Sequence, residues 1–141
     1  MKKKIAILGS TGSIGKTLIE IIKKDKNSFD VILLTADKNY NEILKQAKIL
    51  NVKNLVITNS KSFEELKKRK LGNIKIFNNY NSFGNIFKKK IDYVMSAISG
   101  IHGLEPTVKI IKHTKKIAIA NKEAIICGWH LIKKNLKKHQ T

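Results

Sequence analysis

Residues 4–22 read KIAILGSTGSIGKTLIEII, and this stretch decides the fold. It opens with the short apolar run Ile5–Leu8, and from Ile14 to Ile22 its apolar residues recur at helical spacing. Between the two lie glycines at a three-residue period, Gly9, Gly12 and Gly15. The pattern predicts a strand, a tight turn and a helix. Backbone N–H groups at the start of such a helix, together with the positive end of its dipole, favour a bound phosphate.

The ending Gly15-Lys16-Thr17 raises an alternative, the triphosphate loop of an NTP-hydrolysing enzyme. That loop follows G-x-x-x-x-G-K-[ST], which puts its first glycine at position 10, where this chain has Ser10. It also needs a carboxylate for magnesium after a neighbouring strand, and only Asp37 stands at such a place. We therefore favour the pyrophosphate of a dinucleotide. A strand-to-helix turn without any ligand is the remaining alternative.

Each glycine of the G-x-x-G-x-x-G spacing has its own predicted purpose. Gly9 allows the sharp turn, Gly12 lets the backbone approach the pyrophosphate, and Gly15 lets the helix pack closely on the sheet. N–H groups or a hydroxyl are expected from the residues between them, Thr11, Ser13 and Ile14.

Further apolar runs read as buried strands. They are Asp30–Ala36, Asn54–Thr58, Asn73–Phe77, Ile91–Ile98 and Lys115–Ala120. The predicted helices between and after them run from Tyr40 to Leu50, from a Ser60 or Ser62 cap to about Lys70, from Pro106, and from an Asn121 cap. Strands that alternate with helices predict an α/β fold, a doubly wound, mainly parallel Rossmann-like sheet in one domain spanning residues 1–141.

Composition narrows the function classes. Lys and Arg outnumber Asp and Glu by 29 to 10, but the lysines are spread along the chain and Arg69 is the single arginine. Because readers of base edges favour arginine forks, nucleic acid is not the expected partner. No apolar run is long enough for a membrane span. Cys127 is the single cysteine, which excludes an internal disulfide and favours a reducing, cytoplasmic setting.

The end of the second predicted strand gives independent support for a dinucleotide. Ligands of doubly wound sheets bind beyond the carboxyl ends of the strands, and residues 36–39 lie where such folds contact the adenosine ribose. Asp37 could accept from a ribose 2′-hydroxyl, favouring NAD, whereas Lys38 and Asn39 could hold a 2′-phosphate, favouring NADP. The residues alone leave this choice open, and an ordinary polar turn is the alternative.

Three segments in this order make a specific resemblance. ILGSTGSIG at residues 7–15, AISGIHGLEPT at Ala97–Thr107 and IAIANKEAIICG at Ile117–Gly128 resemble the NADPH-binding domain of 1-deoxy-D-xylulose 5-phosphate reductoisomerase. The resemblance implies an enzyme of non-mevalonate isoprenoid biosynthesis that is a homodimer when complete. In it a divalent metal, Mn²⁺ or Mg²⁺, helps rearrange the sugar phosphate substrate, and NADPH reduces the resulting aldehyde to 2-C-methyl-D-erythritol 4-phosphate.

The resemblance also implies roles for single residues. The family's pyrophosphate contacts fall on Thr11, Gly12, Ser13 and Ile14, and its 2′-phosphate contacts fall on Lys38 and Asn39. Near the nicotinamide end it places Asn121 and Glu123. It gives Lys122 to the substrate, where the ammonium charge would stabilise oxygen anions.

Two features depart from the family pattern. Position 37 is commonly glycine in the family, and the carboxylate of Asp37 would repel a 2′-phosphate. In the family the metal-binding D-S-E motif follows the last helix, and this chain ends at Thr141 without it. We therefore predict no metal ligand and no catalytic residue within residues 1–141, and a chain that does not turn over substrate by itself.

Other chemistry-bearing residues receive structural interpretations. The four histidines lack metal-ligand spacing. Cys127 and His130 share a helix but have no third catalytic group, so Cys127 is expected to be a packed core thiol. Trp129 and Leu131 are expected to be exposed and to invite self-association. The competing functions are another NAD(P)-dependent reductase with this loop and a basic α/β module that binds nucleic acid.

Overall fold

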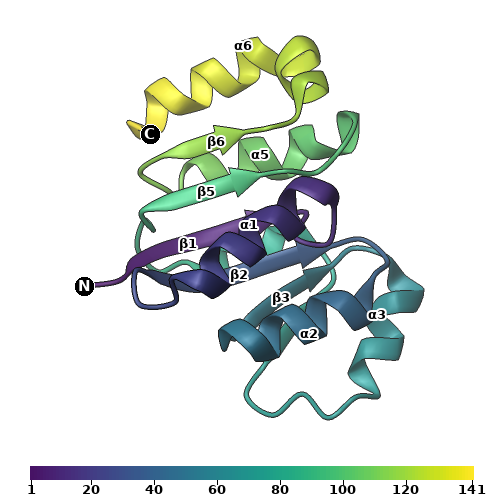
Figure 1. Ribbon diagram of the computed structural model, residues 1–141. Coiled ribbons are helices and arrows are strands. Elements are labelled where there is room, and N and C mark those ends of the chain that lie inside the picture. The colour runs from purple at the N-terminus through teal and green to yellow at the C-terminus, as the bar shows by residue number, and fades with distance from the viewer.

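A six-stranded sheet, parallel throughout, runs through the centre of the computed structural model, which describes residues 1–141 (Figure 1). Its strand order is β4-β3-β2-β1-β5-β6. The strands are β1 (Lys3–Leu8), β2 (Phe29–Ala36), β3 (Asn54–Ile57), β4 (Lys75–Phe77), β5 (Tyr93–Ser96) and β6 (Ile117–Ile119). The predicted α/β, doubly wound Rossmann-like architecture is confirmed, and the parallel pairing extends to every strand of the sheet.

Helices lie on both faces of this sheet. In Figure 1, α1 and α2 lie in front of the strands, α5 lies behind them, and α6 runs along the β6 edge. The helices are α1 (Ser13–Lys24), α2 (Tyr40–Leu50), α3 (Ser60–Lys67), α4 (Phe83–Ile86), α5 (Leu104–Ile111) and α6 (Lys122–His139), with short 3₁₀ turns η1 (Tyr80–Ser82) and η2 (Ile101–Gly103). Coverage of both faces explains why β1 is a continuous apolar run, because Ile5 to Leu8 are all buried.

Two apolar clusters divide the core between the faces of the sheet. Alternate residues of β1 point to opposite sides: Ile5 and Ile7 join the cluster under α1 and α2, whereas Ala6 and Leu8 join the cluster that holds Phe83. This two-residue period is the geometry of a strand buried on both faces. The core therefore fixes the register of β1, and with it the point where the glycine loop leaves the sheet.

The order of the sheet reverses at β1, which pairs with β2 on one side and β5 on the other. Chain connections after β1 and β5 therefore leave the sheet in opposite directions, and a crevice opens between them at the carboxyl ends of the strands. The loops predicted to bind a ligand all start at this edge.

Some predicted helix boundaries are wrong. The cap of α3 is Asn59, whose Oδ1 accepts a hydrogen bond of 3.0 Å from the N–H of Ser62, rather than Ser60 or Ser62. α5 begins at Leu104 instead of Pro106, and Pro106 occupies its first turn. The missing N–H of proline costs nothing there, because the first helical N–H groups have no partner within the helix.

The prediction of a packed core thiol at Cys127 is also wrong, because that side chain is exposed. α6 buries a single narrow stripe, Ala124, Gly128 and Ile132. Gly128 lies so close to Leu104 of α5 that an added Cβ would stand 2.2 Å from Leu104 Cδ1. The stripe follows the four-residue helical period, and Cys127 lies outside it.

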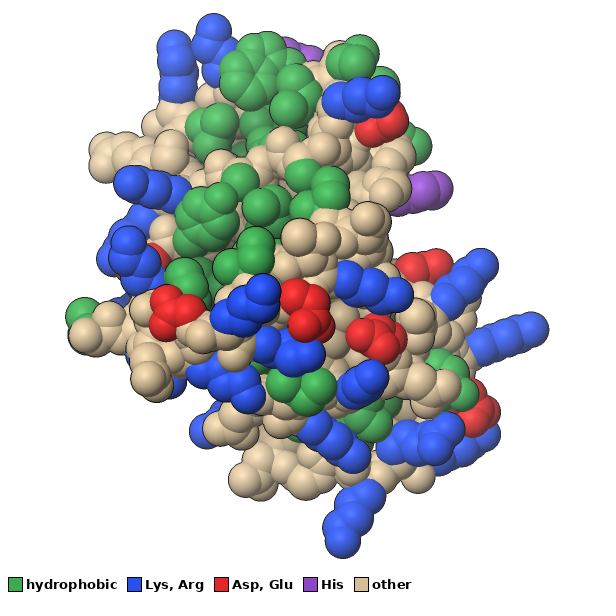
Figure 2. Space-filling view, in the orientation of Figure 1, with side chains coloured by type: hydrophobic (Ala, Val, Ile, Leu, Met, Phe, Trp, Pro, Cys, Tyr) green, Lys and Arg blue, Asp and Glu red, His purple; other side chains and the backbone are tan.

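Large apolar side chains of α6 are exposed, as predicted for Trp129 and Leu131. Trp129 is 48% exposed, Leu131 41% and Ile126 77%. Figure 2 shows hydrophobic side chains gathered on the upper part of this view, between α1 and α6. No helix has the length and apolar character that crossing a membrane requires.

Candidate functional site

The glycine loop is tied to the neighbouring strand before it turns upward into α1. The N–H of Gly9 donates to the Thr35 hydroxyl and the N–H of Ser10 donates to the Thr35 carbonyl, both at 2.9 Å. Gly9 has a φ of +80°, a conformation that L side chains rarely adopt, and an added Cβ would stand 2.9 Å from the Ala97 carbonyl oxygen. The hydrogen bonds to Thr35 of β2 and the absence of a side chain at Gly9 therefore determine the direction of the turn.

Four backbone N–H groups at the end of this loop have no acceptor in the chain. They belong to Thr11, Ser13, Ile14 and Gly15. The N–H of Gly12 is already used, because it donates to the Gly9 carbonyl at 3.2 Å. α1 has no acidic residue in its first turn and no side-chain cap at Gly12. Free donors at the positive end of a 12-residue helix form a site suited to an anion.

Two hollows adjoin these donors on either side of the end of β5. One, of about 170 Å³, is lined by Gly9, Thr11, Gly12, Asp37 and Tyr80, among others. The other, of about 130 Å³, is lined by Ile14, Ala120, Asn121 and Glu123, among others. Both share Ala97, Ile98 and Ser99. The structure thus brings the loop together with Asp37 on one side and with Asn121 and Glu123 on the other.

A larger hollow, of about 470 Å³, lies elsewhere. It is lined mainly by apolar residues of β1 and α1, and also by Lys3, Asp92 and Lys115. Asp92 accepts from the Lys4 N–H and pairs with Lys115 at 2.8 Å, at the amino ends of the strands. None of the four residues with free N–H groups lines this larger hollow. We therefore assign the ligand site to the two smaller hollows.

Three exposed residues follow β2, Asp37, Lys38 and Asn39, and each has different surroundings. Asp37 Oδ1 accepts a 2.8 Å hydrogen bond from the hydroxyl of Thr58, at the end of β3. Asn39 caps α2, because its Oδ1 accepts from the Glu42 N–H at 3.2 Å. Lys38 forms no ion pair with any acidic side chain of the chain. A free ammonium group therefore stands beside a carboxylate that is held toward β3.

Tyr80 also lines the larger of the two hollows, and sequence reasoning missed it. Burial, followed by the negative charge of Asp37, raises the pKa of its phenol to about 12. The folded state thus keeps a phenol proton that the unfolded state releases near pH 10. The protonated phenol therefore contributes to the free energy of unfolding below about pH 10, and this contribution is lost as the pH rises to about 12.

We expect the Tyr80→Phe variant to lack a late tyrosinate step, near pH 12, in an absorbance titration of the folded chain. The same variant should lose less unfolding free energy than the wild type between about pH 10 and about pH 12. A variant that instead lost a step near pH 10, with the late step intact, would contradict this assignment.

Asn121 connects the loop after β5 to the start of α6. It is 5% exposed, its Oδ1 accepts from the Ala124 N–H at 3.0 Å, and its Nδ2 donates to the carbonyls of Ile98 and Gly100. The predicted helix cap is therefore confirmed. Lys122 and Glu123, which follow it, are exposed. Lys122, like Lys38 and Asn39, lines neither hollow.

The carboxylates, imidazoles and thiol of the chain form no cluster of metal ligands. No group of three or more His, Cys, Asp or Glu side chains lies close enough to hold a metal ion. What the site offers to a ligand is the set of free backbone N–H donors at the start of α1.

The sequence model of 1-deoxy-D-xylulose 5-phosphate reductoisomerase matches residues 5–128. The chain belongs to this family. The reductoisomerase of Pelagibacter ubique is 57% identical over 99% of the chain, and that of Wolbachia pipientis from Culex pipiens is 40% identical over 96% of it. The chain spans only 37% and 35% of these two relatives.

Solved reductoisomerase structures share the fold. The enzyme from Zymomonas mobilis, in complex with NADPH, matches the whole chain with a TM-score of 0.89 and 29% identity, and the chain covers 38% of it. A reductoisomerase in complex with NADPH, fosmidomycin and magnesium matches 97% of the chain with a TM-score of 0.87 and 27% identity, and 34% of that protein is covered.

Proposed function

We propose that the chain is the NADPH-binding portion of a 1-deoxy-D-xylulose 5-phosphate reductoisomerase. The observation that carries the proposal is the set of four free N–H groups at the start of α1, two of which belong to Thr11 and Ile14, residues that line the two hollows at the reversal point of the sheet. Family membership and the NADPH named for two matching structures support the same ligand.

Three groups of residues are assigned to three parts of the cofactor. The donors of Thr11, Ser13, Ile14 and Gly15 would hold the pyrophosphate, with Gly12 leaving room for it. Lys38 and Asn39 would contact the 2′-phosphate, beside Asp37. Asn121 and Glu123 would adjoin the nicotinamide end, and Lys122 the sugar phosphate substrate. Bound there, NADPH supplies the hydride that reduces an aldehyde to an alcohol.

The residues of this chain do not fit a divalent metal, since no cluster of ligands is present. A reductoisomerase structure that contains magnesium matches the chain over about a third of its own length, 36%. We therefore propose that the metal belongs to parts of the whole enzyme outside residues 1–141. The proposal also includes a cytoplasmic, homodimeric enzyme: the lone cysteine suits a reducing compartment, and the dimer rests on the family resemblance alone.

Titration calorimetry with NADPH, NADH and ATP tests the proposed function. We expect NADPH to bind and ATP to bind far more weakly. Since the chain carries a net charge of +19, each titration is repeated at high salt, where unspecific attraction of anions is screened. Equal binding of all three ligands, lost at high salt, would contradict the proposal.

We also expect no oxidation of NADPH when the chain is mixed with the sugar phosphate and Mn²⁺, because the metal has no ligands here. NADPH absorbance over time measures this. A steady, enzyme-dependent decrease would show that residues 1–141 contain a catalytic site.

A further inference from the structure

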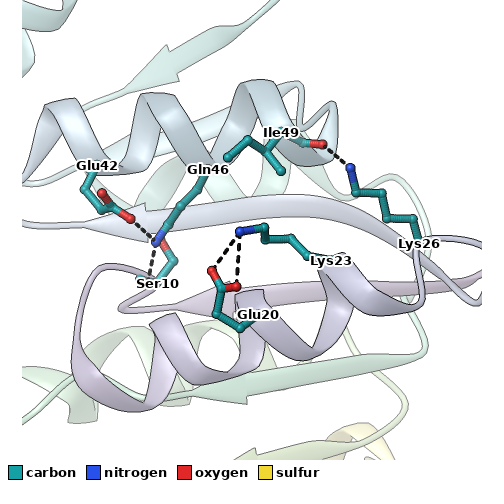
Figure 3. Close-up of polar contacts among 7 residues, drawn as sticks. All are labelled: Ser10, Glu20, Lys23, Lys26, Glu42, Gln46 and Ile49. Carbon is teal, nitrogen blue, oxygen red and sulfur yellow. Dashed lines mark hydrogen bonds and ion pairs between the residues drawn. The ribbon is translucent and has the colours of Figure 1, made fainter.

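Gln46 of α2 is a buried polar residue that the proposed cofactor contacts leave unexplained. Its side chain is 2% exposed, and its Nε2 donates a 3.0 Å hydrogen bond to the carbonyl of Ser10 in the glycine loop (Figure 3). The two residues are 36 positions apart in sequence. A buried amide costs free energy unless it is hydrogen-bonded, so this contact determines how α2 and the loop meet.

The contact fixes the orientation of one peptide group. The peptide between Ser10 and Thr11 is trans, as are all others in the chain. In a trans peptide the C=O and the N–H point in opposite directions. Because Gln46 holds the Ser10 carbonyl toward α2, the Thr11 N–H points away from α2. That N–H is one of the four free donors, and Thr11 lines the larger of the two hollows.

A second hydrogen bond keeps the Gln46 amide in the required orientation. Nε2 also donates to Glu42 Oε1 at 3.3 Å (Figure 3). A flipped amide would turn its oxygen toward both the Ser10 carbonyl and the Glu42 carboxylate. Ser10 Oγ and Gln46 Oε1 are buried without a partner, so neither gives the loop another polar link to α2. The N–H of Glu42, in turn, is bound by the cap residue Asn39.

We propose that Gln46 is a positioning residue that aims the Thr11 N–H at the cofactor's pyrophosphate. The inference rests on the proposed function and deepens it, because it adds to the pyrophosphate site a side chain that does not touch the ligand. It also links the two ends of the adenosine half: α2 starts at the 2′-phosphate residues and, through Gln46, supports the loop that binds the pyrophosphate.

The test compares two ligands in the 141-residue chain. Gln46→Met preserves length and volume but has no N–H to donate, so the Ser10–Thr11 peptide is free to rotate. We expect its Kd for NADPH to rise about tenfold, the usual scale for one oriented hydrogen bond. The Kd for 2′-AMP, which has no 5′-phosphate, should stay within about twofold of the wild-type value. Urea unfolding checks that the variant folds, and Gln46→Leu replaces it if it does not.

Asn54→Leu is the matched control. Asn54 Nδ2 donates to the Ile32 carbonyl at 3.0 Å, the same type of contact, at the opposite end of the sheet. We expect this variant to lose unfolding free energy without a change in the Kd for NADPH. The inference is overturned if Gln46→Met binds NADPH as the wild type does, or if it loses NADPH and 2′-AMP to the same extent.

The backbone order parameter of Thr11, measured by NMR without ligand, separates this inference from the proposed function. We expect it to fall in Gln46→Met and to stay unchanged in Asn54→Leu. A wild-type chain that does not bind NADPH would overturn the proposed function, whereas an unchanged order parameter at Thr11 in Gln46→Met would overturn the inference about Gln46.

Discussion

Replacing Gly15 with alanine is expected to destabilise the chain by about 3–5 kcal/mol, enough to unfold many small domains. An added Cβ would stand 2.3 Å from the Gly9 carbonyl oxygen and 2.6 Å from Ser10 Cα. Both atoms belong to backbone, which Thr35 holds in place through the N–H groups of Gly9 and Ser10. Neither side of the contact can move without breaking the connection between β1 and α1, so the overlap cannot be relieved cheaply.

Gly12→Ala is the comparison that separates folding from binding. The nearest atom to its added Cβ is the Gly9 carbonyl oxygen, at an ordinary contact distance of 3.5 Å, and the φ of −76° suits any residue. We expect Gly12→Ala to unfold in urea as the wild type does but to lose NADPH affinity, because the methyl group occupies the approach to the pyrophosphate. Similar stability of the Gly15 variant and the wild type would contradict the close packing of α1 on the loop.

The fold was predictable because its strands are buried on both faces. Such strands are short apolar runs, and glycines follow two of them at their carboxyl ends, Gly9 and Gly12 after β1 and Gly100 and Gly103 after β5. The pattern also gave the position of the turn at Gly9, since a positive φ next to a strand end favours glycine. Helix ends were less predictable, because Asn59, Ser60 and Ser62 are all good caps and only the geometry shows which side chain bonds.

Side-chain contacts between distant elements were not predictable from periodicity. Cys127 has the character of a core residue, but α6 packs on α5 along one narrow stripe and leaves the thiol outside it. Gln46 and Thr35 gave weak signals, a polar residue on the apolar side of a helix and a hydroxyl within an apolar strand. Their partners, Ser10 and Gly9, lie far away in sequence, so the purpose of each becomes visible only in the structure.

Lys38→Ala is expected to weaken NADPH binding about tenfold while leaving NADH nearly unchanged, since the 2′-phosphate is the group that the two cofactors do not share. The ammonium of Lys38 has no acidic partner in the chain, so no ion pair has to break before it binds a phosphate. Lys116→Ala, at the amino ends of the strands, is the control for the general loss of positive charge. An equal loss for both cofactors in Lys38→Ala would contradict a 2′-phosphate contact.

Asp37 is expected to weaken the binding of NADPH, in contrast to Lys38, and the size of this effect depends on Thr58. The hydroxyl of Thr58 holds Asp37 Oδ1 toward the end of β3, so a carboxylate and a 2′-phosphate can both be present if this hydrogen bond persists. We expect Asp37→Gly to tighten NADPH binding several-fold and Thr58→Val to weaken it, because the released carboxylate is free to approach the phosphate. In the double variant the Thr58 substitution should have no further effect, since no carboxylate remains to be held. Calorimetric Kd values for NADPH and NADH in all four proteins test this, and a Thr58 effect that survives without Asp37 would mean that Thr58 acts by another route.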